Sequence, residues 1–201
     1  MAASPAAEIA AAAARLVVDE GMEYGAAKHK AARQLLRRRG AAGELPSTEE
    51  VEDEVRAHLQ LFRADSQPAE LLALRRLALR WMERLAEFRP HLAGAVWRGT
   101  ATRLSPVLLD LYCDDPKAAE IGLINLGVPY EPGGVDPHTG QHALSLTERR
   151  SELGEPITVH LTVRDRDDLR GALKPDSRGR SWRGDAAALR RLLAGDAATA
   201  R

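Results

Sequence analysis

Apolar residues recur at helical spacing through the first ninety residues of the chain. Ala, Leu and Val follow intervals of three and four over residues 6–39, which predicts helix. Gly21 and Gly25 are expected to divide this stretch into two helices. A capped segment with acidic residues in its first turn predicts a helix over 47–62, and a stripe of Leu, Ala and Trp predicts another over 65–88.

Beyond residue 90 the pattern changes to short apolar and alternating runs. A buried strand is predicted over 106–113, and alternating strands are predicted over 142–147 and 157–163. Asp-Pro begins a predicted helix over 115–126, and a last helix is predicted over 185–194. Polar and glycine-rich segments are predicted to be loops, namely 131–141 and 174–185.

This order of elements predicts an α+β fold, in which a small mixed sheet is covered by helices. We expect a helical segment over residues 1–66 and an α/β domain over residues 67–201. The chain of 201 residues is long enough for one such domain with a helical extension.

Composition excludes several classes of protein. The 29 basic and 29 acidic residues cancel, so the chain as a whole has no charge that favours nucleic acid or membrane surfaces. A single cysteine, Cys113, excludes an internal disulfide and a multi-cysteine zinc site. The Ala-rich N-terminus lacks a basic region, and no apolar run approaches the ~20 residues of a membrane helix. We therefore expect a soluble, cytoplasmic protein.

One segment carries a chemical signature. Residues 92–109 read L-A-G-A-V-W-R-G-T-A-T-R-L-S-P-V-L-L, with a glycine, then Arg-Gly-Thr-Ala at 98–101, then a serine ahead of the predicted strand. This segment resembles, without a gap, the active-site signature of the polymerase-beta-like nucleotidyltransferases, and the resemblance extends more loosely to about residue 170. A glycine there lets the backbone approach nucleotide phosphates.

The departures from the family pattern fall on its working positions. Two aspartates spaced i, i+2 on the strand hold magnesium in the family, but Pro106 and Leu108 occupy these positions here. The family's serine after the glycine is Ala95. The third carboxylate is expected on the neighbouring strand, where His160 is the best-placed residue, and imidazole binds magnesium poorly.

The resemblance therefore implies a degenerate, non-catalytic nucleotidyltransferase-like protein with no metal cofactor. Such a protein would bind a nucleotide, a nucleic acid or a protein through the former active-site groove. The positions that match the family's motif, with one neighbouring arginine, give the candidate ligand-binding residues Gly94, Arg98, Gly99, Thr100, Arg103 and Ser105.

An active enzyme is the alternative. Asp110 and Asp114 share the strand parity of positions 106 and 108, so they are candidates, with His160, for a relocated Mg²⁺ site and catalysis. Asp114 also suits a strand end that leads into the helix capped by Asp115. Asp110 interrupts an apolar run, and a buried carboxylate needs a partner. Arg98 and Arg103 are the partners we expect for it.

Two basic stretches are candidates for contact with phosphates. One covers residues 28–39, and the other covers 164–191, with nine basic and five acidic residues around Trp182. Residues 44–70 hold eight acidic and two basic residues and are expected to pair with the first stretch. Nucleic-acid binding is therefore the less favoured interpretation. A third possible class is a helical interaction protein that contacts a protein partner through residues 1–65.

Overall fold

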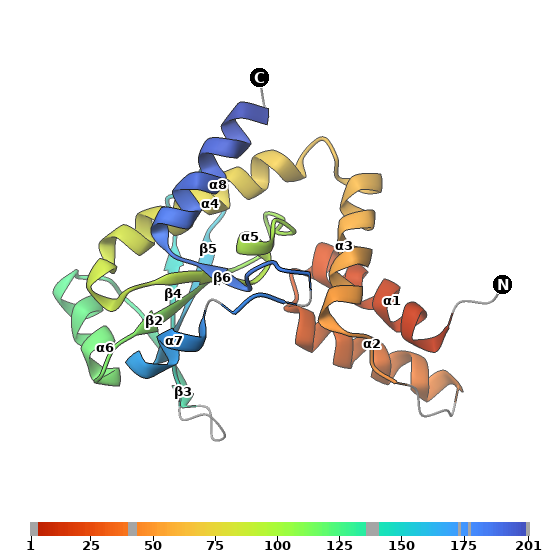
Figure 1. Ribbon diagram of the computed structural model, residues 1–201, viewed down its shortest axis with the longest axis horizontal. Coiled ribbons are helices and arrows are strands. Elements are labelled where there is room, and N and C mark those ends of the chain that lie inside the picture. Colours follow the sequence, from red (N-terminus) through yellow and green to blue (C-terminus); the bar gives the residue numbers. More distant parts are fainter. Residues whose placement is uncertain (1–3, 40–43, 136–140, 173, 177, 200–201) are drawn as a thin grey trace. The chain divides into compact units, whose positions relative to one another are not determined.

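The computed structural model describes residues 4–39, 44–135, 141–172, 174–176 and 178–199. The helices are α1 (Pro5–Glu20), α2 (Tyr24–Arg39), α3 (Thr48–Phe62), α4 (Gln67–Arg84), α5 (Gly94–Arg98), α6 (Pro116–Asn125), α7 (Leu169–Ala172) and α8 (Ala186–Thr199). The strands are β1 (His91–Ala93), β2 (Val107–Tyr112), β3 (Glu131–Val135), β4 (His142–Glu148), β5 (Ile157–Arg164) and β6 (Arg183–Gly184). The predicted α+β class is confirmed (Figure 1).

The chain forms two compact units, and each contains more than one piece of the sequence. The first comprises Met1–Glu70 and Thr100–Ser105, and the second comprises Leu71–Gly99 and Pro106–Arg201. A six-residue segment that follows α5 therefore belongs to the unit built from the N-terminal helices. None of the described helices is long and apolar enough to cross a bilayer.

The first unit consists of α1, α2 and α3 packed together. Ser4 caps α1 through its side chain, and α1 ends at Gly21, whose φ of 67° suits glycine. A reciprocal capping box joins Ser47 and Glu50 at the start of α3. Small residues on α1 let the helices approach closely, and the buried core of this unit includes Ala13, Val17, Val18, Ala27, Ala31, Val51 and Val55.

The segment Thr100–Ser105 is fixed by contacts with α2 and with the first turn of α4. The Tyr24 and Thr100 hydroxyl groups share a short hydrogen bond. Gln67 Nε2 donates to the Ala101 carbonyl at 2.9 Å, and the Arg103 amide donates to Glu70 Oε2 at 2.9 Å. These contacts, which span 76, 34 and 33 residues of sequence, order a segment without regular secondary structure.

The second unit contains a sheet with the strand order β3-β4-β5-β2-β1-β6. β2 pairs with β5 in parallel, and the other neighbouring strands are antiparallel. This confirms the expected neighbouring strands, since Leu108 lies beside His160 and Asp110 beside Thr162. The expected glycine turn into a helix is α5, which begins at Gly94.

The two faces of the sheet differ in chemistry. Val107, Leu109 and Leu111 of β2 are almost fully buried, as are the residues beside them on β5. α4 and α8 lie side by side along the sheet (Figure 1), joined by ion pairs from Arg75 to Asp196 and from Arg190 to Glu83. The opposite face, called the polar face below, carries Asp110, His160 and Thr162 together with Leu108 and Tyr112. Alternation along β2 therefore places the Asp110 carboxylate away from the apolar core.

Several predicted boundaries were wrong. β1 and β6 were not anticipated, and residues 131–135, expected to be loop, form β3 beside β4; residues 136–140 of that predicted loop lie outside the described residues. α4 ends at Arg84 and a 3-10 turn covers Ala86–Phe88, whereas α8 continues to Thr199. β3 forms because it pairs with β4. Its own sequence contains one Pro and two Gly, which have low strand propensity.

Candidate functional site

Asp110 lies between two guanidinium groups on the polar face of the sheet. Its Oδ1 is 2.9 Å from Arg164 Nε, and its Oδ2 is 2.9 Å from Arg183 Nη1. The Asp110 side chain is 7% exposed, whereas those of Arg164 and Arg183 are 23% and 22% exposed. The carboxylate is therefore buried, while both cations remain accessible from one side.

The expected partners of Asp110 were wrong. Arg98 and Arg103 are near in sequence, but the sheet brings distant residues to the carboxylate. Parallel pairing sets Arg164 beside Tyr112, two residues along β2 from Asp110, and Arg183 arrives on β6 at the other side of β1.

The ion pairs at Asp110 are close in distance but poorly aligned as hydrogen bonds. Asp110 Oδ2, Arg164 Nε and Arg183 Nε have no aligned hydrogen-bond partner among the residues that the structure describes. Arg183 Nη1 instead donates to the Tyr112 hydroxyl at 3.0 Å. Burial raises the pKa of Tyr112, although the hydrogen bond from Arg183 acts to lower it. The two guanidiniums therefore keep hydrogen-bonding capacity that Asp110 does not use.

A pocket of about 400 Å³ adjoins the two arginines that pair with Asp110. Arg164 and Arg183 both line it, together with Lys174 and the ring of Trp182. Among the described lining residues Asp168 is the one carboxylate, against three cationic side chains. The pocket therefore offers charge and N–H donors that suit a phosphate or another oxyanion.

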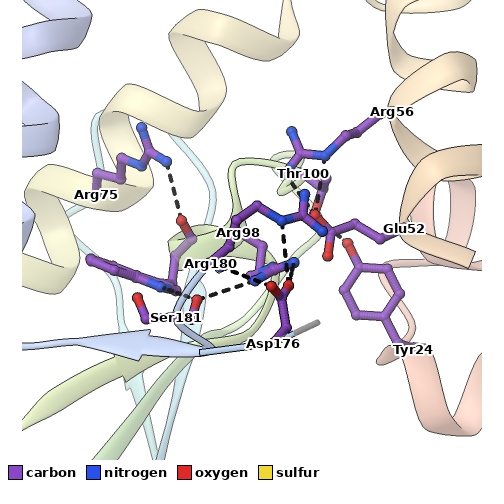
Figure 2. A network of polar contacts seen from close by, with 10 residues as sticks. Tyr24, Glu52, Arg56, Arg75, Arg98, Thr100, Asp176, Arg180 and Ser181 are labelled. Atoms are coloured by element: carbon purple, nitrogen blue, oxygen red, sulfur yellow. Dashed lines mark hydrogen bonds and ion pairs between the residues drawn. The ribbon is translucent and has the colours of Figure 1, made fainter. Parts of the chain in front are cut away.

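Arg98 and Asp176 hold the loop that contributes Trp182 to this pocket. Arg98 Nη2 lies 2.9 Å from Asp176 Oδ2, and Nη1 donates to the Ser181 carbonyl at 3.1 Å (Figure 2). The guanidinium carbon also lies 4.4 Å from the centre of the Trp182 ring, which is a cation–π contact. Arg98 is thus a positioning residue for the loop and for Trp182.

Asp176 also stabilises the same loop through hydrogen bonds with its backbone. Its Oδ1 accepts hydrogen bonds from the Arg178 and Arg180 amides at 2.9 and 2.8 Å. Burial acts to raise the pKa of Asp176, but these amides and the guanidiniums of Arg98 and Arg180 outweigh it and lower the pKa to about 2. The carboxylate is therefore charged throughout the physiological range.

The two predicted motif glycines have conformational roles. Gly94 begins α5 at φ 65°, and a Cβ built there would lie 2.7 Å from Leu108 Cδ1. Gly99 ends α5 at φ 81°. Both positions lie in the left-handed region that favours glycine, so the backbone alone accounts for them.

Three other predicted residues belong to the first unit. Thr100 is bonded to Tyr24, and Ser105 Oγ accepts a hydrogen bond from the Thr102 amide at 3.0 Å. The Arg103 amide is bound to Glu70. The contacts of Thr100 and Ser105 and of the Arg103 backbone order the segment 100–105.

The remaining candidates are held in separate contacts. His160 lies beside Leu108, and its Nδ1 is 2.8 Å from Ser145 Oγ; burial lowers the pKa of the imidazole. Asp114 pairs with Arg166 at 3.0 Å, and Asp115 caps α6, as the strand-end interpretation predicted. Across the described residues, no group of three or more His, Cys, Asp or Glu is placed to hold a metal ion.

Sequence reasoning identified the basic stretch 164–191 around Trp182 but did not select Lys174, Arg164 and Arg183 within it. In the first basic stretch Lys30 contacts Glu20 of α1 at 2.6 Å. The side chains of residues 36–39 lie outside those that the structure describes, so the pairing of this stretch with residues 44–70 stays a prediction. No protein-family model matches the chain, and neither a curated protein nor a solved structure matches it.

Proposed function

We propose that this protein is a degenerate nucleotidyltransferase-like protein that binds a phosphate-bearing ligand without a metal ion. The observation that carries the proposal is the pairing of Asp110 with Arg164 and Arg183 beside the pocket. In a metal-dependent transferase a carboxylate on this strand faces a cation and the phosphates arrive with magnesium. Here two fixed guanidiniums take the place of the metal charge.

The order of elements supports the nucleotidyltransferase part of the proposal. A strand leads through Gly94 into the short helix α5, and β2 follows with β5 parallel beside it. Positions 106 and 108, where the family carries its aspartates, are Pro106 and Leu108. The face of β2 that would hold metal therefore carries one carboxylate, Asp110, and it is already neutralised.

Ligand titration tests the proposal directly. Calorimetry with pyrophosphate and with nucleoside triphosphates, each in EDTA and in Mg²⁺, is expected to show binding that does not need the metal and weakens with salt. Bound ligand is also expected to raise the thermal midpoint by mass action. Arg183→Ala is expected to weaken binding by about tenfold or more. Arg149→Ala, on an exposed loop away from the pocket lining, is the matched control.

Asp110→Asn separates this proposal from an active enzyme. Removing the carboxylate frees both guanidiniums, so anion binding is expected to strengthen. A transferase with its metal on Asp110 and Asp114 would instead incorporate label from a triphosphate in Mg²⁺ or Mn²⁺, and Asp110→Asn would abolish that incorporation. Robust labelling by the wild-type protein that this variant loses would replace our proposal with the enzyme.

A second proposal concerns the N-terminal helices, which offer a surface for a protein partner. Leu61 and Phe62 at the end of α3 are 74% and 64% exposed, beside a hollow that Ala11, Ala14 and His58 help to line. Exposed apolar groups beside a hollow are typical of contact surfaces. Sedimentation at rising protein concentration, with a Leu61→Gln/Phe62→Gln variant for comparison, tests whether that partner is a second copy of the chain.

A further inference from the structure

A second pocket of about 440 Å³ lies in the α/β unit, among different residues from the first. The end of α4, the start of β1 and the first turn of α8 contribute to it. Met82, Pro90 and Leu169 give it an apolar lining, and Arg89, His91 and Asp185 add polar groups. This volume falls in the range of roughly 300–1,000 Å³ that is typical of small-molecule sites.

His91 presents a fixed hydrogen-bond acceptor in this pocket. Its residue is 6% exposed, and its Nδ1 lies 2.9 Å from the Arg89 carbonyl. A carbonyl only accepts, so Nδ1 carries the hydrogen and Nε2 of the neutral ring carries a lone pair. Within the described residues Nε2 forms no hydrogen bond, and an edge contact with Tyr112 at 5.2 Å restrains the ring. Nε2 is absent from the buried side-chain atoms that lack a partner among the described residues, so solvent reaches it and a ligand can as well.

Arg89 supplies a cation from a strained backbone position. Its φ of 48° makes it the one non-glycine residue with positive φ in the part of the chain that the structure describes. The side chain is exposed, and its guanidinium pairs with no described residue. Such conformations persist where surrounding structure imposes them, and they are enriched at ligand sites.

The first turn of α8 supplies further donors and a second acceptor. Asp185 caps this helix of 14 residues, with Oδ1 accepting from the Ala188 amide at 2.7 Å. The Ala186 and Ala187 amides, whose residues line the pocket, have no partner among the described residues. Free amides and the positive end of a helix favour a carboxylate, while Asp185 and His91 favour a hydrogen-bond donor.

We propose that this pocket binds a free amino acid with an apolar side chain. Its carboxylate pairs with Arg89 and the first amides of α8, and its ammonium group pairs with Asp185 and the His91 imidazole. Its side chain packs against Met82, Pro90 and Leu169. A plain carboxylic acid leaves the two acceptors without a donor, and an amine leaves the guanidinium and amides without an anion.

Calorimetry on the full-length protein tests the proposal with leucine, phenylalanine and methionine. For leucine the comparison ligands are 4-methylpentanoate, which lacks the amino group, and leucinamide, which lacks the carboxylate. We expect saturable binding of at least one amino acid, and at least tenfold weaker binding of both leucine analogues if leucine is the ligand. The corresponding deaminated acid and amide serve for phenylalanine or methionine. Failure of all three amino acids to bind overturns the proposal, as does equal binding of the matched analogues.

Arg89→Gly is the sharpest variant, because glycine tolerates a positive φ and the change removes the guanidinium with the rest of an exposed side chain. We expect it to fold as stably as the wild type and to bind the amino acid at least tenfold more weakly, while Arg149→Ala binds normally. Unchanged binding by a folded Arg89→Gly protein overturns the proposal. Arg89→Gly should leave phosphate binding in the Asp110 pocket unchanged. The two proposals can therefore be tested and rejected independently of one another.

Discussion

Arg98 and Asp176 form an ion pair from which solvent is almost fully excluded, with side-chain exposures of 3% and 0% and a separation of 2.9 Å between Nη2 and Oδ2. The pair joins α5 to a residue 78 positions later in the chain. It therefore closes the loop that carries Trp182 and helps to shape the wall of the basic pocket.

Arg98→Ala is expected to destabilise the α/β unit, because it leaves the Asp176 carboxylate without its closest cation and removes the cation–π contact to Trp182. Arg98→Lys is expected to restore only part of the stability, since an ammonium group cannot reproduce the planar fork of donors. Urea unfolding curves measure the loss, and tryptophan fluorescence reports the environment of Trp182. Equal stability of Arg98→Ala and wild type would contradict this role.

The same pair gives the protein a defined acid sensitivity. The pKa of Asp176 is lowered from an ordinary value of 3.8 to about 2, so the charged carboxylate stabilises the fold above pH 3.8 and this contribution is lost as the pH falls toward 2. The difference in unfolding free energy between wild type and Asp176→Asn should be constant near neutrality and shrink across that interval. A difference that stays constant down to pH 2 would argue against the depressed pKa.

Tyr24 is expected to produce the opposite dependence at high pH. Burial is the main cause that raises its pKa from 10.0 to about 12, so the protonated phenol stabilises the fold below pH 10 and this contribution is lost between these values. Tyr24→Phe removes the bond to Thr100 and should cost about 1 kcal/mol. Unfolding curves at pH 8 and above compare the two proteins, and ultraviolet titration follows the late-ionising phenol.

Gly94→Ala tests whether this glycine serves conformation. A Cβ there adds the strain of a positive φ, about 1–2 kcal/mol, and a clash with Leu108 of about 1–3 kcal/mol. In a Leu108→Ala background only the first cost should remain, so the two changes are expected to be non-additive in unfolding free energy. Full additivity would show that the contact with Leu108 does not limit the site.

The central strands were predictable because the pattern of apolar and polar residues within each strand indicates its burial. β2 is a continuous apolar run and β5 alternates, and both patterns reflect burial of the apolar face of the sheet. β1 has three residues and β6 has two, which is too short for any periodicity. β3 exists because β4 pairs with it, and no local propensity indicated that partner.

The candidate site was less predictable for a related reason. The apolar surroundings of Asp110 in sequence indicated a buried carboxylate that needs a cation, and this was confirmed. Which cation satisfies it depends on sheet register, and Arg164 and Arg183 lie 54 and 73 positions away in a stretch rich in arginine. Local sequence favoured Arg98 and Arg103 as the partners, whereas the fold pairs Arg98 with Asp176.

The placement of Thr100–Ser105 with the N-terminal helices has a consequence for modularity. A single cut near residue 70 would not release a complete α/β unit, because the excised piece would carry a segment whose partners, among them Tyr24 and Gln67, remain on the other fragment. Gly21 packs closely against the backbone of the same segment, since a Cβ built at Gly21 would lie 2.3 Å from the Leu104 carbonyl oxygen. Recombination at a single point in the gene could not transfer either unit intact. We therefore expect the two units to occur together in related proteins.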